Sequence, residues 1–210
     1  MVQRWQSTGL YDQLEAVKTV FIEPRQAGKR EFEKFLTQFN HLARDRTKPD
    51  NGGPSGGLMF AVYRGKISEG IDFSDDACRA VINIGIPFPY MKNVQVMLKQ
   101  KYNDEAAEAS AYPRLKGSEW YSTQAYRAMN QALGRCIRHR RDWGAIIFLE
   151  SRFTSSMHVR KLSKWIRTRV KPFHHFDQAI GEIQTFMEHW SEHSSSPATP
   201  VVIEILDEDL

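Results

Sequence analysis

Four short and nearly continuous apolar runs alternate along this chain with longer segments of helical periodicity. The runs are TVFI (19–22), LMFAVY (58–63), AVINIGI (80–86) and GAIIFLE (144–150). Nearly continuous apolar runs of this kind are typical of strands buried on both faces of a parallel sheet. Strands that alternate with helices indicate parallel pairing, because the crossover between parallel strands is usually a helix. The sequence therefore predicts an α/β domain whose mainly parallel sheet is flanked by helices.

Helices are expected before, between and after these runs, over 10–17, 93–109, 119–137, 158–170 and 174–190. The segment from Arg30 to Arg44 repeats apolar residues every three or four positions, which predicts an amphipathic helix. Its apolar residues are expected in the core: Phe32, Phe35, Leu36, Phe39 and Leu42. The domain is expected to span residues 1–190.

The last residues, 191–210, form a tail of different composition. A Ser/Pro-rich stretch, SEHSSSPATP, is expected to be a flexible linker, and it leads to VVIEILDEDL. This apolar peptide with an acidic end resembles a SUMO-interacting motif, which would bind by adding a strand to a partner's sheet. The alternatives are a last strand docked on its own domain, or disorder.

Composition limits the class of protein. The 210 residues, 41% of them hydrophobic, suffice for a packed core, and 29 basic against 25 acidic residues permit nucleic-acid binding without requiring it. Cys78 and Cys136 form no CxxC pair, which argues against a disulfide scaffold, a zinc site or a self-contained iron–sulfur cluster. No apolar run approaches the ~18 residues of a membrane span, and no signal peptide is evident, so we expect cytosol or nucleus.

The segment QALGRCIR (131–138) is the first that suggests chemistry. If it is helical, Gln131, Gly134, Arg135 and Arg138 fall on one face. Guanidinium groups bind phosphate oxygens bidentately and stay charged at any working pH, so this face would suit a nucleotide or nucleic-acid phosphate. The alternative is a solvated basic end of a helix, since further arginines follow directly.

A second segment, RGKISEGIDFSDD (64–76), follows an apolar run directly. Ligands of open α/β sheets bind outside the carboxyl ends of the strands, where this loop is expected. Asp72 would accept hydrogen bonds from a ribose, while Arg64, Lys66 and Ser68 would meet phosphates of a nucleotide or a nucleic acid. The alternative is a solvated turn.

Together these segments resemble the second motor domain of superfamily 2 DNA helicases of the xeroderma pigmentosum group D type. The resemblance covers about residues 4–190 and rests on TVFIEPR, YRGKISEGIDFSDDACRAVINIGIPFP, SEWYSTQAYRAMNQALGRCIRHRRDWGAIIFLESRF and LSKWIR. It implies a RecA-like fold and a nuclear, 5′ to 3′ ATP-dependent DNA helicase that acts in DNA repair. In such a motor the second half closes onto nucleotide held by the first.

The resemblance also implies roles for single residues. The family's motif V falls on residues 64–73 and its motif VI on residues 131–138. Arg138 is expected to be the arginine finger, with Arg135 as its partner and Gln131 beside them. The other implied assignments are nucleotide contact for Glu69, Gly70, Asp72 and Gly134, and nucleic-acid contact for Arg64, Lys66 and Ser68. No metal ligand is expected in this chain.

The chain also departs from a complete motor. It has no GxxxxGK[ST] loop and no DEAH sequence, so ATP and Mg²⁺ are expected to be held mainly by a first motor domain. The family's iron–sulfur cluster and the opening strand of the domain are likewise expected outside this chain. Its partners would be single-stranded or forked DNA and the first motor domain, and the isolated chain would be inactive. The alternative is a non-catalytic module that binds nucleic acid or protein.

Overall fold

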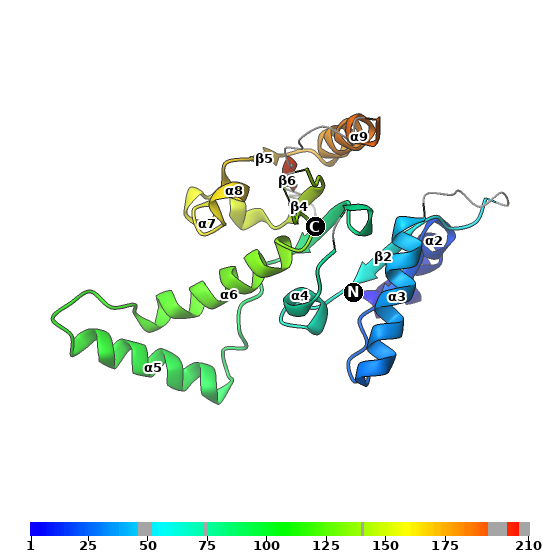
Figure 1. Cartoon of the computed structure of the whole chain (residues 1–210). Helices are drawn as coiled ribbons and strands as arrows, with labels where there is room; N and C mark the ends of the chain where they lie inside the picture. Colours follow the sequence, from blue (N-terminus) through cyan, green and yellow to red (C-terminus); the bar gives the residue numbers. More distant parts are fainter. Residues whose placement is uncertain (46–51, 74, 140, 193–200, 206–210) are drawn as a thin grey trace.

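The computed structural model of the chain describes residues 1–45, 52–73, 75–139, 141–192 and 201–205 (Figure 1). A four-stranded parallel sheet in the order β3-β4-β6-β5 is formed by β3 (Ala80–Ile84), β4 (Ala145–Leu149), β5 (Val170–Phe173) and β6 (Val201–Ile205). A second parallel sheet pairs β1 (Thr19–Ile22) with β2 (Gly57–Phe60). The expected parallel α/β architecture is confirmed.

The helices pack on both faces of the larger sheet. Alternate residues of β4 point to opposite sides, as in any strand, so Ile146 and Phe148 meet α6 (Gly117–Leu133) while Ala145 and Ile147 meet α9 (Phe176–Glu192). Both faces of β4 are therefore covered, and this strand has the double-sided burial that its sequence predicts.

The smaller sheet has its own helical layer and its own core. Here α1 (Val2–Ser7) and α2 (Leu10–Val17) precede β1, and α3 (Lys29–Arg44) lies between β1 and β2 in the sequence. Phe32 and Phe39 are buried as expected, and Phe39 meets both Phe21 and Phe73 edge-on. The other expected core residues, Phe35, Leu36 and Leu42, are partly buried against this cluster.

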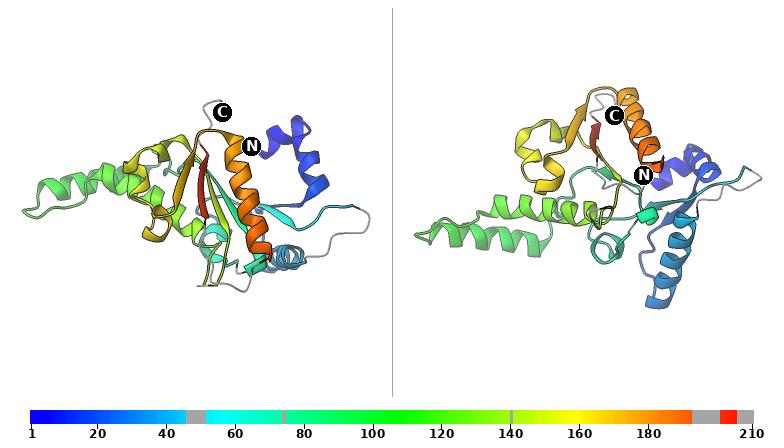
Figure 2. Two further views of the ribbon diagram at one scale, coloured as in Figure 1. Left: turned by 90° about the horizontal axis from the view of Figure 1, so that it is seen from above. Right: turned by 45° about the horizontal axis from the view of Figure 1, so that its top comes forward.

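A helical hairpin projects from the body. It consists of α5 (Val94–Glu108) and α6, and Figures 1 and 2 show it extending away from both sheets in every view. Gly117 allows the two helices to approach closely, because a Cβ there would lie 2.5 Å from the carbonyl oxygen of Gln100. Its N–H donates to Asp104 of α5 at 2.8 Å.

The remaining elements are short. They are α4 (Lys66–Gly70), α7 (Ser156–Val159), α8 (Lys164–Arg167) and the 3₁₀ turns Asp75–Ala77 and Ser151–Thr154. The single helix expected over 158–170 is therefore wrong. Asn130 interrupts it, since its Oδ1 accepts hydrogen bonds from both the backbone N–H and the hydroxyl of Ser163 at 2.9 Å.

Two strands also differ from expectation. The run 58–63 is a strand only to Phe60, and β3 is not buried on both faces, because Ile82 and Ile84 are 53% and 49% exposed. Ile82 is paired with Ile147 and so points to the α9 side of the sheet, and the hydrophobic clusters that the described part of the chain forms on that side include no residue of β3. In the described residues β3 also pairs with β4 alone and β2 with β1 alone, so each has an unpaired edge. The expected absence of an opening strand stays a prediction.

The tail enters the larger sheet. Residues 201–205 pair with β4 and β5 as β6, which corresponds to the alternative of a last strand docked on its own domain. The expected linker, 193–200, and the acidic end, 206–210, lie outside the described residues. Binding of SUMO stays a prediction.

Candidate active site

The loop after β2 is held by a carboxylate from the end of β1. Glu23 accepts hydrogen bonds from the backbone N–H groups of Val62 at 2.9 Å and Ile67 at 3.2 Å. Gly65 lies against this carboxylate, and a Cβ at position 65 would be 2.6 Å from Glu23 Oε1. Arg64, next to it, has the left-handed backbone that non-glycine residues adopt rarely, with a φ of 62°. The loop is thus fixed in one unusual conformation.

Glu23 is a site residue that the sequence interpretation missed. A signal was present, since Glu23 follows the apolar run TVFI directly and so lies at the carboxyl end of a strand, where ligands and their supporting residues gather.

The helix that carries the arginine pattern ends earlier than expected. α6 stops at Leu133, and the next residues form tight turns in which the Arg135 N–H donates to the Ala132 carbonyl. The prediction that Gln131, Arg135 and Arg138 share one helical face is therefore wrong. Gly134, at the C-cap, ends the helix.

Tertiary contacts nevertheless bring the two arginines together on Asp72. Arg135 pairs with Asp72 Oδ1 through Nη1, and Arg138 pairs with Asp72 Oδ2 through Nη2. The carboxylate is half exposed, and the Arg135 and Arg138 side chains are 20% and 34% exposed. Two cations thus share one carboxylate at the surface, which leaves an excess positive charge able to attract an anion.

Arg135 has further partners that make it the more rigid of the two. Its Nε donates to the Ser68 carbonyl at 3.2 Å and its Nη2 to the Glu69 carbonyl at 2.6 Å. These carbonyls belong to the last residues of α4, where basic side chains satisfy orphaned acceptors. Arg138 Nη1 donates only within its own segment, to the Gly134 carbonyl at 3.0 Å.

Gln131 faces a different part of the site. It lines a hollow of about 330 Å³ together with Arg64, Glu69, Gln124, Arg127 and Ala128. Arg64 is held at its rim by a hydrogen bond from Nη2 to the Gln124 carbonyl at 3.3 Å. The sequence interpretation missed Arg127, although it lies one helical turn before Gln131 and so on the same face.

The other expected residues surround α4. Gly70 and Lys66 line a second hollow, of about 440 Å³, beside Arg64. Lys66 Nζ donates to the Ala27 carbonyl at 3.1 Å and lies 5.2 Å from the centre of the Phe32 ring. Ser68 is buried, and its hydroxyl donates to the Gly65 carbonyl at 3.2 Å. In this structure both side chains support the loop, and their contact with nucleic acid stays a prediction.

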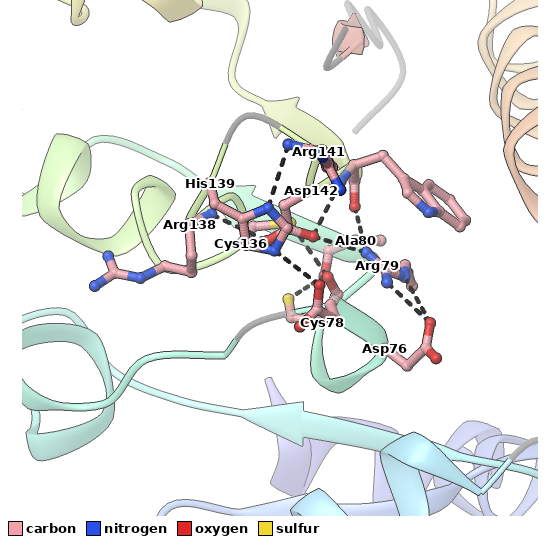
Figure 3. A network of polar contacts seen from close by, with 11 residues as sticks. Asp76, Cys78, Arg79, Ala80, Cys136, Arg138, His139, Arg141 and Asp142 are labelled. Atoms are coloured by element: carbon pink, nitrogen blue, oxygen red, sulfur yellow. Dashed lines mark hydrogen bonds and ion pairs between the residues drawn. The ribbon is translucent and has the colours of Figure 1, made fainter. Parts of the chain in front are cut away.

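The two cysteines are distant in sequence but adjacent in space. Cys136 Sγ lies 3.6 Å from the carbonyl oxygen of Cys78, and both thiols are free (Figure 3). A hydrogen bond between the two thiol side chains lowers the pKa of Cys78 and raises that of Cys136, and burial adds to the increase at Cys136. The segment 131–138 is therefore packed directly on the residues that follow the segment 64–73.

Comparison with known proteins places this arrangement in a family. The helicase C-terminal domain family matches residues 1–169, and the chain belongs to it. The resemblance to superfamily 2 helicases of the xeroderma pigmentosum group D type is thereby confirmed. A Fanconi anemia group J protein homolog of Gallus gallus is 47% identical over 187 residues, which are 88% of this chain and 14% of that protein.

A second kind of relative matches at similar length. A regulator of telomere elongation helicase 1 homolog of Drosophila persimilis is 40% identical over 199 residues, 93% of this chain and 19% of that protein. The chain thus spans less than a quarter of the curated relatives it matches. None of the helices in the described ranges is both long and apolar enough to cross a bilayer.

Proposed function

We propose that this chain is the second motor domain of an ATP-dependent DNA helicase and that it supplies Arg138 as an arginine finger. The convergence of Arg135 and Arg138 on Asp72 carries the proposal. These side chains come from motifs about sixty residues apart in sequence, yet they meet at one exposed point. The family match and the names of the helicase relatives support it.

The geometry supports different roles for the two arginines. Arg135 is held by two carbonyls of α4, so it remains in place and keeps Asp72 paired. Arg138 is the more exposed and can exchange Asp72 for a phosphate oxygen when a nucleotide approaches. The γ-phosphate of ATP carries more negative charge than one carboxylate and accepts bidentate bonds from guanidinium.

In this proposal Arg138 stabilises the negative charge that spreads over the transferred phosphoryl group. Such a contribution is worth roughly 10³- to 10⁵-fold in rate in related phosphoryl-transfer systems. ATP and Mg²⁺ would be held mainly by a first motor domain, as would the iron–sulfur cluster expected for the family. Closure of that domain onto Asp72 and Arg138 would complete the catalytic site.

The DNA partner is part of the same proposal. Arg64, Arg127 and Gln131 line one hollow beside α4, and such a set of donors suits phosphates of a single strand. Unwinding in the 5′ to 3′ direction, action in DNA repair, a nuclear location and SUMO binding by the tail carry over from the resemblance as proposals. The relative's name, Fanconi anemia group J protein homolog, agrees with a repair role.

The test is ATP hydrolysis by a motor that carries a first motor domain of the family together with this chain. We expect hydrolysis stimulated by single-stranded DNA, and a loss of at least about 10³-fold in kcat for Arg138→Ala. Arg141→Ala is the control, because it removes an exposed cation from the same segment. An inactive motor whose C-terminal half still binds DNA in a salt-dependent way would favour the non-catalytic binding module.

A further inference from the structure

Asp142 is a charged side chain buried behind the arginine site. It is 1% exposed, and its two oxygens accept three hydrogen bonds (Figure 3). Oδ2 accepts from the backbone N–H of Arg138 at 3.0 Å, and Oδ1 accepts from the Trp143 N–H at 3.0 Å and from Arg79 Nη1 at 2.9 Å. A buried carboxylate is stable only when hydrogen bonds and charges compensate for its loss of water, so these three hydrogen bonds hold the Asp142 side chain in one position.

Arg79 fixes the carboxylate from the other side. Besides Asp142, its Nη1 binds the Trp143 carbonyl at 2.7 Å, and its Nε and Nη2 bind Asp76 Oδ1 at 3.2 and 2.9 Å. The guanidinium carbon also lies 4.4 Å from the centre of a Trp143 ring. The backbone of Arg79 is tied to the sheet as well, because its carbonyl accepts from the Ala145 N–H at 2.9 Å. Arg79 therefore links Asp142 to the start of β3 and β4.

This link matters because Arg138 lies beyond the end of its helix. With α6 ending at Leu133, the Arg138 N–H has no helical acceptor, and Asp142 takes that place. The guanidinium of Arg138 can then change partners while its backbone stays anchored to the sheet.

We infer that Asp142 is a positioning residue for Arg138 and that Arg79 holds Asp142 in that role. The inference rests on the proposed function of Arg138, and it adds two residues that do not touch Asp72. A finger whose backbone is not anchored would reach the phosphoryl group in fewer productive conformations, which lowers the rate of the chemical step more than the binding of ATP.

The test uses Asp142→Asn in the motor that carries both motor domains. Asparagine has nearly the same shape, but its NH2 group, which replaces one carboxylate oxygen, donates hydrogen bonds and cannot accept the one that this oxygen accepts. With saturating single-stranded DNA we expect kcat to fall about 10- to 100-fold and KM for ATP to change less than about twofold. An unchanged kcat, or a loss confined to KM, would overturn the inference.

A double variant separates positioning from general structural damage. If Asp142 acts through Arg138, Asp142→Asn should change kcat by less than about twofold once Arg138→Ala is present, because effects that share one route do not multiply. Equal factors in both backgrounds would show a structural role instead and would overturn the inference. If Arg138→Ala leaves kcat unchanged, the proposed function fails. If Arg138→Ala lowers kcat but Asp142→Asn leaves it unchanged, only this inference fails.

Arg79→Lys provides the second variant, in case Asp142→Asn does not fold. Lysine keeps a positive charge near Asp142 but cannot bind Asp142, Asp76 and the Trp143 carbonyl with one planar group. We expect a loss of about tenfold in kcat that also disappears in the Arg138→Ala background. A melting temperature close to that of the parent would show that the fold is retained, and full activity of a folded variant would contradict the role of Arg79.

Discussion

Removal of the Glu23 carboxylate should loosen the loop after β2 by a measurable amount. Glu23→Ala deletes the acceptor of the N–H groups of Val62 and Ile67. A hydrogen bond to a charged acceptor contributes about 1.5 to 3 kcal/mol, and the lower end applies here because Glu23 is only partly buried and water can reach the loop. The two bonds together should therefore cost about 3 kcal/mol of unfolding free energy.

Glu23→Gln is the graded variant, because it keeps one acceptor oxygen without the charge. It should cost about 1 kcal/mol. The assay is urea denaturation followed by circular dichroism, together with amide hydrogen exchange as the local readout. We expect faster exchange at Val62 and Ile67 in Glu23→Ala, since both N–H groups lose their acceptor. Glu33→Ala, an exposed carboxylate change on α3, is the matched control and should leave both amides protected.

The Gly65→Ala substitution tests whether the Glu23 carboxylate lies against Gly65, because its effect on stability should depend on that carboxylate. In the parent chain Gly65→Ala should destabilise, because the new Cβ would lie 2.6 Å from Glu23 Oε1 and displace the carboxylate. In the Glu23→Ala background the same change should be nearly neutral, since its clash partner is gone and the φ of −80° at position 65 suits alanine. If Gly65→Ala destabilised the chain equally in both backgrounds, the reasoning would be refuted, because the Glu23 carboxylate would then not lie against Gly65.

Two further predictions concern titratable groups. Hydrogen bonds from Arg152 lower the pKa of Glu150, so its contribution to stability is present above the ordinary carboxyl value of 4.5 and is lost as the pH falls through the lower folded-state pKa. Glu150→Gln should cost about 1 kcal/mol at neutral pH, discounted because Arg152 is partly exposed, and chemical denaturation should show this difference vanishing in acid. Iodoacetamide should label Cys78 before Cys136, because Cys78 has the lower pKa and is partly exposed while Cys136 is buried; equal labelling in peptide maps would contradict this.

The local sequence predicted where four of the strands lie but not how they are buried. All four apolar runs contain strands, yet β4 is covered on both faces while β3 is half exposed. Both runs have the same apolar character, and α9 covers β4 but not β3, which decides which one is buried on both faces. The run 58–63 ends early for another reason, since the Val62 N–H is directed to Glu23 instead of a neighbouring strand.

The strand β5 could not be predicted from its sequence. β5 contains Pro172, which has no N–H to donate and argues against a central strand. The structure accommodates it because β5 lies at the edge of the four-stranded sheet and pairs with β6 alone in the described part of the chain. Its position as an edge strand depends on β6, which comes from a segment that was expected to be a separate tail.

The sequence by itself determined the α/β class and the family, because apolar periodicity and motif spacing are local properties. It also predicted which side chains would meet a phosphate. Tertiary structure decided how those side chains are used. Arg135 and Arg138 meet at Asp72 although their helix ends before either of them, and Arg79 reaches Asp142 across 63 positions. Charged groups leave water only where several donors and acceptors converge, and that convergence is set by the packing of distant segments, which no local pattern encodes.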